Sequence, residues 1–276
     1  MEIKPLELIK KHKKKVLILS IITKIPLMLY IIWILSTVPT IDAINPDYEV
    51  IKGAHRGDSV ECIENTFNAL KNATDKDEYE FVEFDIQYTK DRQIVVYHDI
   101  ALLRLEGKSD QIENLTYDEL QELSSFPIPT YQEVMDYVGG KKKLDIEIKS
   151  QGNLEDDKEL IDFVVKDCTE RGILEDIMIS SVSGDAIIYS KEKYPDIKTG
   201  KIYWILSSTY IPIPSLTENL YEDIENMDAD YIMLHGANIH NMTDLVEQKP
   251  EDVTLAFWYF DNQMYLVEVD ENDGIW

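Results

Sequence analysis

The chain has 276 residues, 44% of them hydrophobic and 29% charged, a composition that supports one sizeable core and excludes a largely disordered polypeptide. Residues 1–24 carry seven Lys and two Glu, formally +5, against −26 for the whole chain, so residues 25–276 carry −31. This charge excludes nucleic acid as a partner of the domain. Two cysteines, Cys62 and Cys168, are too few for a disulfide framework and leave open either one bridge or two free thiols.

The apolar run 16–38 follows the basic residues 1–15 and contains one charge, Lys24. At about 1.5 Å rise per residue, a helix of this length crosses a hydrocarbon core of roughly 30 Å. By the positive-inside rule, residues 1–15 stay in the cytoplasm and the rest of the chain lies outside. We therefore expect a single-pass cell-membrane protein with an extracytoplasmic domain. A cleaved signal peptide is the competing interpretation, but its apolar region is shorter, about 7–15 residues.

Residues 39–49 contain two prolines and no periodicity, which predicts a linker to a folded domain at 50–276. In that domain short apolar runs alternate with amphipathic stretches. We expect strands at 50–54, 80–87, 94–97, 143–149, 177–180, 201–206, 231–234 and 253–259. We expect helices at 64–72, 116–123, 130–137, 159–169, 186–193 and 220–226. This alternation predicts an α/β fold with parallel strands and crossover helices.

Two of the expected strands, 81–87 and 143–149, alternate polar and apolar side chains. Antiparallel strands with one solvated face give the same pattern. In a parallel barrel the polar face points inward, and acidic groups crowded there require a counter-ion near the C-terminal strand ends. The polar positions of the two strands are Glu83, Asp85 and Gln87, and Asp145, Glu147 and Lys149.

Four short segments carry reactive side chains to the same strand ends. A histidine after a strand, taken alone, is commonly structural. Together, however, two imidazoles, three carboxylates and one lysine at successive strand ends predict a reactive site. The segments are His55-Arg56-Gly57, Glu83-Phe84-Asp85, His98-Asp99 and Glu147-Ile148-Lys149.

In their order and spacing these motifs resemble the glycerophosphodiester phosphodiesterase family. The resemblance is strong over 51–150, with GAHRG, ENT, VEFDIQYTKDRQIVVYHD and LDIEIK in succession, and thinner over 177–276. It implies a (β/α)8 TIM barrel with an insertion within 100–142. Residues 273–276 look like the beginning of the eighth strand, so we expect a barrel that is truncated in its last β/α unit or closed differently.

The resemblance implies one divalent cation held by three acids, Glu83, Asp85 and Glu147. Three hard carboxylate oxygens suit Mg²⁺ or Ca²⁺. The implied activity is metal-dependent hydrolysis of a glycerophosphodiester to glycerol phosphate and an alcohol. Either a substrate hydroxyl attacks phosphorus to give a cyclic phosphate, or water attacks directly, and the sequence leaves both routes open.

The resemblance also implies that His55 and His98 act as general base and general acid. Arg56 and Lys149 would bind the phosphate. Glu64 would bind Arg56 or contact the metal ligands from outside. Alternatively, Glu64 is only a favourable charge in the first turn of a helix.

Several questions stay open at this point. The expected anchor leaves room for lipid-derived substrates, such as lysophospholipids, or for polyol-phosphate wall polymers. The unusual C-terminal residues leave room for a membrane-anchored binding module without catalysis. His235 and His240 have no motif partner and are expected on the surface or in loops, while Trp204 and Trp258 belong either to the pocket or to the core. The oligomeric state is not determined by the sequence.

Overall fold

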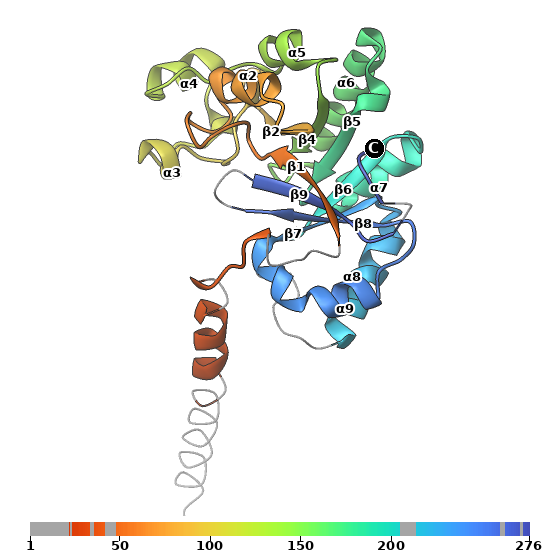
Figure 1. Cartoon of the computed structure of the whole chain (residues 1–276). Helices are drawn as coiled ribbons and strands as arrows, with labels where there is room; N and C mark the ends of the chain where they lie inside the picture. Colours follow the sequence, from red (N-terminus) through yellow and green to blue (C-terminus); the bar gives the residue numbers. More distant parts are fainter. Residues whose placement is uncertain are drawn as a thin grey trace, which may run out of the picture.

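The computed structural model describes residues 22, 24–33, 36–41, 48–204, 214–259, 263–270 and 273–276. The predicted anchor, 16–38, therefore lies partly outside the described residues. Within them, no helix combines the length and the apolar character needed to cross a membrane. Residues 24–33 are helical and extend from one end of the molecule (Figure 1), where Trp33 stacks on His240 with ring centroids 5.8 Å apart.

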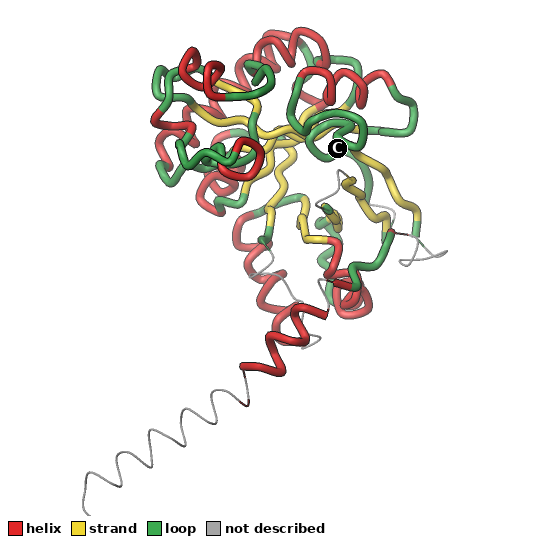
Figure 2. Tube along the Cα trace, turned by 90° about the vertical axis from the view of Figure 1, so that its left-hand side faces the viewer, coloured by secondary structure: helices red, strands yellow, loops and turns green. Residues whose placement is uncertain are grey.

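Nine strands lie within the described residues, and eight of them close into a barrel with helices outside it (Figure 2). β3 (Ile94–Val96) pairs with β2 outside the ring. Around the ring the strands are β1 (Glu49–Ala54), β2 (Phe81–Tyr88), β4 (Lys143–Ile148), β5 (Ile177–Ser181), β6 (Lys198–Ile202), β7 (Tyr231–His235), β8 (Thr254–Trp258) and β9 (Gln263–Glu268), which pairs again with β1.

The helices lie mainly between the strands in sequence, which confirms the predicted alternation. Thr116 and Thr130 begin two of these helices, α4 (Tyr117–Leu123) and α5 (Tyr131–Val138), with complete capping boxes. The helices are α2 (Phe67–Asp75), α3 (Leu103–Glu106), α4 (Tyr117–Leu123), α5 (Tyr131–Val138), α6 (Leu154–Arg171), α7 (Gly184–Lys193), α8 (Pro214–Met227) and α9 (Met242–Glu247). Short 3-10 turns occupy Ile112–Asn114, Leu174–Asp176 and Gly236–Asn241.

The alternating strands β2 and β4 point their apolar side chains outward, against the helices. Phe84 and Ile146, for example, share one buried cluster with residues of α2, α5 and α6. β2 and β4 pair in parallel, with Asp85 opposite Glu147. The acids of both strands therefore point into the barrel, and the antiparallel interpretation of their pattern is wrong.

The inside of the barrel is apolar at the N-terminal ends of the strands. Gly53 makes room there, because a Cβ at this position would lie 2.1 Å from the ring of Phe81. The ring of Trp276 packs edge-on against Phe81 and Tyr231, with centroids 5.3 and 5.9 Å away. Since this end is filled by side chains, the charged groups are confined to the opposite end, which we call the mouth.

The barrel closes through β9 rather than through the residues that resemble an eighth strand. β9 is antiparallel to both neighbours, β1 and β8, because only residues 259–262 connect it to β8. Met264 and Leu266 join the cluster that contains Phe81, while Tyr265 and Val267 join a second buried cluster. Residues 273–276 form no strand. The prediction of an eighth strand there was wrong. β6 ends at Ile202, so the predicted strand 201–206 does not continue through 203–204, and 205–206 lie outside the described residues.

Candidate active site at the barrel mouth

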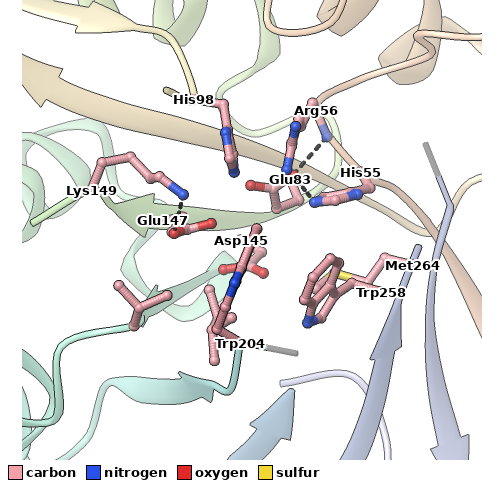
Figure 3. A pocket seen from close by; sticks show the side chains of 12 residues that line it. His55, Arg56, Glu83, His98, Asp145, Glu147, Lys149, Trp204, Trp258 and Met264 are labelled. Carbon is pink, nitrogen blue, oxygen red and sulfur yellow. Dashed lines mark hydrogen bonds and ion pairs between the residues drawn. The ribbon is translucent and has the colours of Figure 1, made fainter. Parts of the chain in front are cut away.

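The mouth gathers all the predicted reactive side chains except Asp85 around one pocket, which they line (Figure 3). His55 follows β1 directly, and the three acids lie on β2 and β4. His98 arrives by a different route. β3 runs antiparallel to the protruding end of β2, so the hairpin turns back and brings His98 to the level of Asp85, whose carbonyl accepts the amide of Tyr97 at 3.1 Å.

The three predicted metal ligands form one buried cluster. Glu83, Asp85 and Glu147 each offer a carboxylate oxygen within 4.8 Å of the others. Within the described residues, Glu83 Oε1 has no hydrogen-bond partner. Asp85 Oδ1 lacks a hydrogen-bond partner there as well. Converging buried carboxylate oxygens, two of them without a hydrogen-bond donor, are a fitting ligand set for a hard divalent cation.

The cluster is electrostatically unbalanced without a cation. Burial, followed by repulsion from Asp85 and its neighbours, raises the pKa of Glu83 well above its ordinary value. Burial also raises the pKa of Glu147 to about 8, although Lys149 opposes it. Burial disfavours ionisation of Asp85 too, but Lys149, His98 and Arg56 outweigh it and hold its pKa well below the ordinary range.

Two loop residues after β1 hold the acids in place. The amide of Asn65 donates to Asp85 Oδ2 at 2.6 Å, and its oxygen accepts the backbone N–H of Asp85 at 3.2 Å. The backbone N–H of Arg56 donates to Glu83 Oε2 at 2.6 Å. Both residues have positive φ, 56° for Asn65 and 60° for Arg56. Such an unfavourable backbone conformation is kept where the surrounding contacts, here the hydrogen bonds to the acids, hold it in place. The sequence motif contained Asn65, but its role was missed.

His55 is buried and oriented by the backbone. Its Nδ1–H donates to the carbonyl of Tyr259 at 2.8 Å, which leaves the lone pair on Nε2, 3.9 Å from Glu83 Oε2. Burial and the nearby Arg56 lower the pKa of His55 well below its ordinary value. The imidazole is therefore neutral near pH 7 and able to accept a proton at Nε2.

His98 is linked to Arg56 by a chain of hydrogen bonds and ion pairs. Its Nδ1–H donates to Asp99 Oδ1 at 2.7 Å, and Asp99 Oδ2 accepts from Arg104 Nε at 2.8 Å. Arg104 also grips both oxygens of Glu64, at 2.5 and 2.8 Å. Glu64 in turn accepts from Arg56 Nη1 at 2.9 Å.

This chain of ion pairs decides the role of Glu64 and adds Arg104 to the site. Glu64 lies before α2, whose N-cap is Thr66, so it is not a first-turn helix charge. Arg104 comes from α3 in the insertion, and no motif singled it out. Only the folded structure shows that Arg104 connects Asp99, the partner of His98, to Glu64, the partner of Arg56.

The two predicted phosphate-binding cations lie beside the acids. Lys149 Nζ is 2.6 Å from Glu147 Oε1 and 3.3 Å from Asp85 Oδ1. Arg56 Nε is 3.7 Å from Asp85 Oδ2. Both side chains line the pocket, so a phosphate in the pocket would meet two positive charges.

The opposite wall of the pocket is apolar. The indoles of Trp204 and Trp258 stack there with centroids 5.8 Å apart. His235, predicted on the surface, is instead buried and packs edge-on against Trp258 at 4.9 Å. His240 is exposed, as predicted, and donates from Nε2 to the carbonyl of Thr37 at 3.1 Å. The apolar lining consists of Val182, Ile202, Trp204, Trp258 and Met264.

A closed eight-stranded barrel with three convergent acids, two imidazoles and two cations at its mouth defines a TIM-like barrel with a candidate metal site. The chain belongs to the glycerophosphoryl diester phosphodiesterase family, whose model matches residues 55–271. The earlier resemblance to this family is thereby confirmed.

Individual relatives agree with this assignment. The chain is 32% identical over 161 residues to a glycerophosphodiester phosphodiesterase of Caldanaerobacter subterraneus, covering 54% of this chain and 65% of that relative, just under two thirds of its length. It is similar to the crystal structure of the Thermotoga maritima glycerophosphodiester phosphodiesterase, with a TM-score of 0.57, 26% identity and coverage of 74% and 83%. An Oleispira antarctica phosphodiesterase, solved in complex with the product sn-glycerol-3-phosphate, shares the fold with a TM-score of 0.60 at 22% identity, over 75% and 83% of the chains.

Proposed function

We propose that this protein hydrolyses glycerophosphodiesters to glycerol phosphate and an alcohol, with one divalent cation at the barrel mouth. The observation that carries the proposal is a pocket lined by His55, His98, Glu83 and Glu147, with Asp85 completing a cluster of three acids beneath it. In the reaction, the P–O bond to the leaving alcohol breaks and a P–O bond to the attacking oxygen forms. The attacking oxygen loses its proton to the general base, and the general acid delivers a proton to the oxygen of the leaving alcohol.

The acids Glu83, Asp85 and Glu147 would hold Mg²⁺ or Ca²⁺. A bound cation supplies Lewis-acid stabilisation of the charge on the phosphate oxygens. Arg56 and Lys149 add two fixed positive charges to the same pocket, so they orient the phosphate against the two histidines.

The histidines divide the proton transfers according to their partners. His55 has a backbone carbonyl behind Nδ1 and a lone pair on Nε2, which suits a general base. Burial lowers the pKa of His98, but the carboxylate of Asp99 behind Nδ1 opposes that shift, and this anionic partner suits a general acid. Whether the base takes its proton from a substrate hydroxyl or from water is decided by trapping a cyclic phosphate.

We further propose that residues 16–38 anchor the chain in the cell membrane, with residues 1–15 inside and the barrel outside. The support is the length of the apolar run and the basic residues before it. Protease protection of tagged full-length chain in intact cells tests the orientation. An accessible N-terminal tag, or a chain found shortened after secretion, contradicts the anchor.

The activity is tested with full-length chain in detergent and a panel of glycerophosphodiesters, with and without chelator. We expect glycerol phosphate release that chelator abolishes and Mg²⁺ or Ca²⁺ restores. His55→Ala and His98→Ala should fold normally by circular dichroism and lose turnover. A chain that folds, binds the cation and turns over no diester would instead favour the binding module.

A further inference from the structure

A fourth acid lies beside the three candidate metal ligands without belonging to their cluster. Asp145 precedes Glu147 by two residues on β4, so both side chains point into the barrel. The parallel register of β2 and β4 sets Asp145 opposite Glu83, one level deeper than the pair of Asp85 and Glu147. Among the described residues, Asp145 is outside the group of acids whose oxygens could share one cation. The sequence motif around Glu147 gave Asp145 no role.

One carboxylate oxygen of Asp145 is held in place, and the other is not satisfied. The hydroxyl of Ser180, on β5, donates to Asp145 Oδ1 at 2.6 Å. The side chain is fully buried, and within the described residues its Oδ2 has no hydrogen-bond partner. A buried carboxylate oxygen without a donor is unfavourable and uncommon in folded proteins. Because Ser180 fixes the carboxylate, Oδ2 is an acceptor prepared for a donor from outside the chain.

The carboxylate of Asp145 borders the part of the pocket served by His55. Asp145 lines the pocket, and Figure 3 shows it and His98 on opposite sides of the other acids. Its register partner, Glu83, has Oε2 at 3.9 Å from Nε2 of His55. The indole of Trp258 packs on the same imidazole, with centroids 6.0 Å apart. A group bound against Asp145 therefore lies on the side of the proposed base.

The surroundings of Asp145 favour a hydroxyl as the missing donor. Beyond the acids, the pocket near it is lined by the apolar side chains of Ile202, Trp258 and Met264. A second metal ion would require several oxygen ligands at this depth, and the described residues on this side are apolar. A single hydroxyl requires one acceptor, while the carbon atoms that carry it pack against the apolar side chains.

We propose that Asp145 is a specificity-determining residue that accepts a hydrogen bond from the far hydroxyl of the substrate's glycerol, the one not adjacent to the phosphate ester. This inference rests on the proposed function and deepens it. The leaving alcohol faces His98, which protonates it, so the glycerol retained on phosphorus lies toward His55 and the floor of the pocket. The hydroxyl next to the ester is the one that attacks if a cyclic phosphate forms. The far hydroxyl is then left for Asp145.

The experiment compares two diesters that differ by this one hydroxyl. Full-length chain in detergent with Mg²⁺ is given glycerophosphocholine or the phosphocholine diester of propane-1,2-diol, which keeps the hydroxyl next to the ester and lacks the far one. Choline release is followed. We expect kcat/KM to favour glycerophosphocholine by about a hundredfold, because the propanediol analogue leaves the buried oxygen unpaired. Asp145→Ala should reduce this preference to below about fivefold, whereas Asp145→Asn, which can still pair with a hydroxyl, should keep it above about tenfold.

Two neighbouring serines on β5 supply matched variants. Ser180→Ala removes the hydroxyl that orients Asp145, so it should lower the preference about tenfold. Ser181→Ala removes an equally buried hydroxyl that donates to the carbonyl of Ile148 instead, so the preference should not change. Mn²⁺ binding is measured in each variant. A preference that is lost only together with Mn²⁺ binding would overturn the inference, because Asp145 would then act through the cation site.

A preference near one in the unmutated chain, or one that Asp145→Ala leaves unchanged, would also overturn the inference. Turnover of neither diester would instead defeat the proposed function. Binding then still decides the role of Asp145. Chain loaded with Mg²⁺ should bind glycerol phosphate at least about tenfold more tightly than the phosphate of propane-1,2-diol, and Asp145→Ala should abolish the difference. Equal affinities, or no binding of either phosphate, would contradict the assignment of Asp145.

Discussion

The mouth of the barrel has two walls of opposite character. The wall formed by β1, β2 and β4 carries the ionisable groups, and each is tied to neighbours by short hydrogen bonds. The wall formed by β5, β6, β8 and β9 carries apolar and aromatic side chains. Removing one member of the charged wall leaves a buried charge uncompensated, which costs more than a lost packing contact of similar size. The comparison predicts where substitutions act on catalysis and how strongly.

The largest effect is expected at Asp85. Asp85→Asn removes an anionic ligand and sets two amides against each other at Asn65, so kcat/KM should fall by at least about a thousandfold at saturating Mg²⁺. The measurement is glycerol phosphate release. Asp58→Asn is the control, since Asp58 is an equally buried acid that pairs with Lys76 away from the pocket. An equal loss in both variants would contradict the assignment.

Two histidines, His98 on the charged wall and His235 packed behind the apolar wall, extend the comparison. His98→Gln should lower kcat by roughly a hundredfold to ten-thousandfold, because general acid–base groups contribute about that much. His235→Gln alters a more deeply buried histidine that packs on Trp258, so its loss should stay below about tenfold. Steady-state rates on one soluble diester are sufficient. The reverse ranking would mean that the catalytic wall has been misassigned.

Arg104 tests whether the ion-pair chain positions His98. Arg104→Gln should lower kcat by about tenfold and raise the pKa of His98 in the pH–rate profile, because the carboxylate of Asp99 loses its other cation. Arg104→Lys should restore part of the rate. Arg92→Gln is the matched control, since Arg92 is also 44% exposed and ion-paired, but with α6. A rate loss without a shifted profile would leave Arg104 a purely structural residue.

The smallest effect is the pH dependence of the cation-free protein. Burial raises the pKa of Glu147 from 4.5 to about 8, so between these values the folded chain keeps a proton that the unfolded chain has lost. Its free energy of unfolding should therefore fall as pH rises through this window. A divalent cation binds the ionised acids, so its Tm increase should grow from about pH 6 to about pH 8.5. Thermal melts with Glu147→Gln, in which this trend should weaken, supply the control; a cation effect that shrinks with pH would count against the site.

The charged wall could be predicted from the sequence because its residues are local and patterned. Glu83 and Asp85 alternate with apolar residues on one strand, and Glu147 repeats the pattern on the next. A parallel pairing then forces them together, as the register of β2 and β4 does. Side chains that point inward from adjacent strands require no further information to be placed in one site.

The rest depended on contacts between distant segments. Arg104 acts through Asp99 and Glu64, and the residues 64 and 104 meet only when α3 folds over the loop after β1. β9 carries an apolar run that fits a strand or a buried helix equally well, and the short connection to β8 decides its direction. His98 reaches the mouth through a hairpin, although its sequence context resembled a parallel strand end.

The central claim is that five side chains converge on a single cation at the barrel mouth. Its most direct test is titration of the full-length, chelator-treated chain with Mn²⁺, followed by electron paramagnetic resonance. We expect one tightly bound ion per chain, lost in the double variant Glu83→Gln/Glu147→Gln and displaced by Mg²⁺ or Ca²⁺. Binding that survives the double variant unchanged would contradict the account.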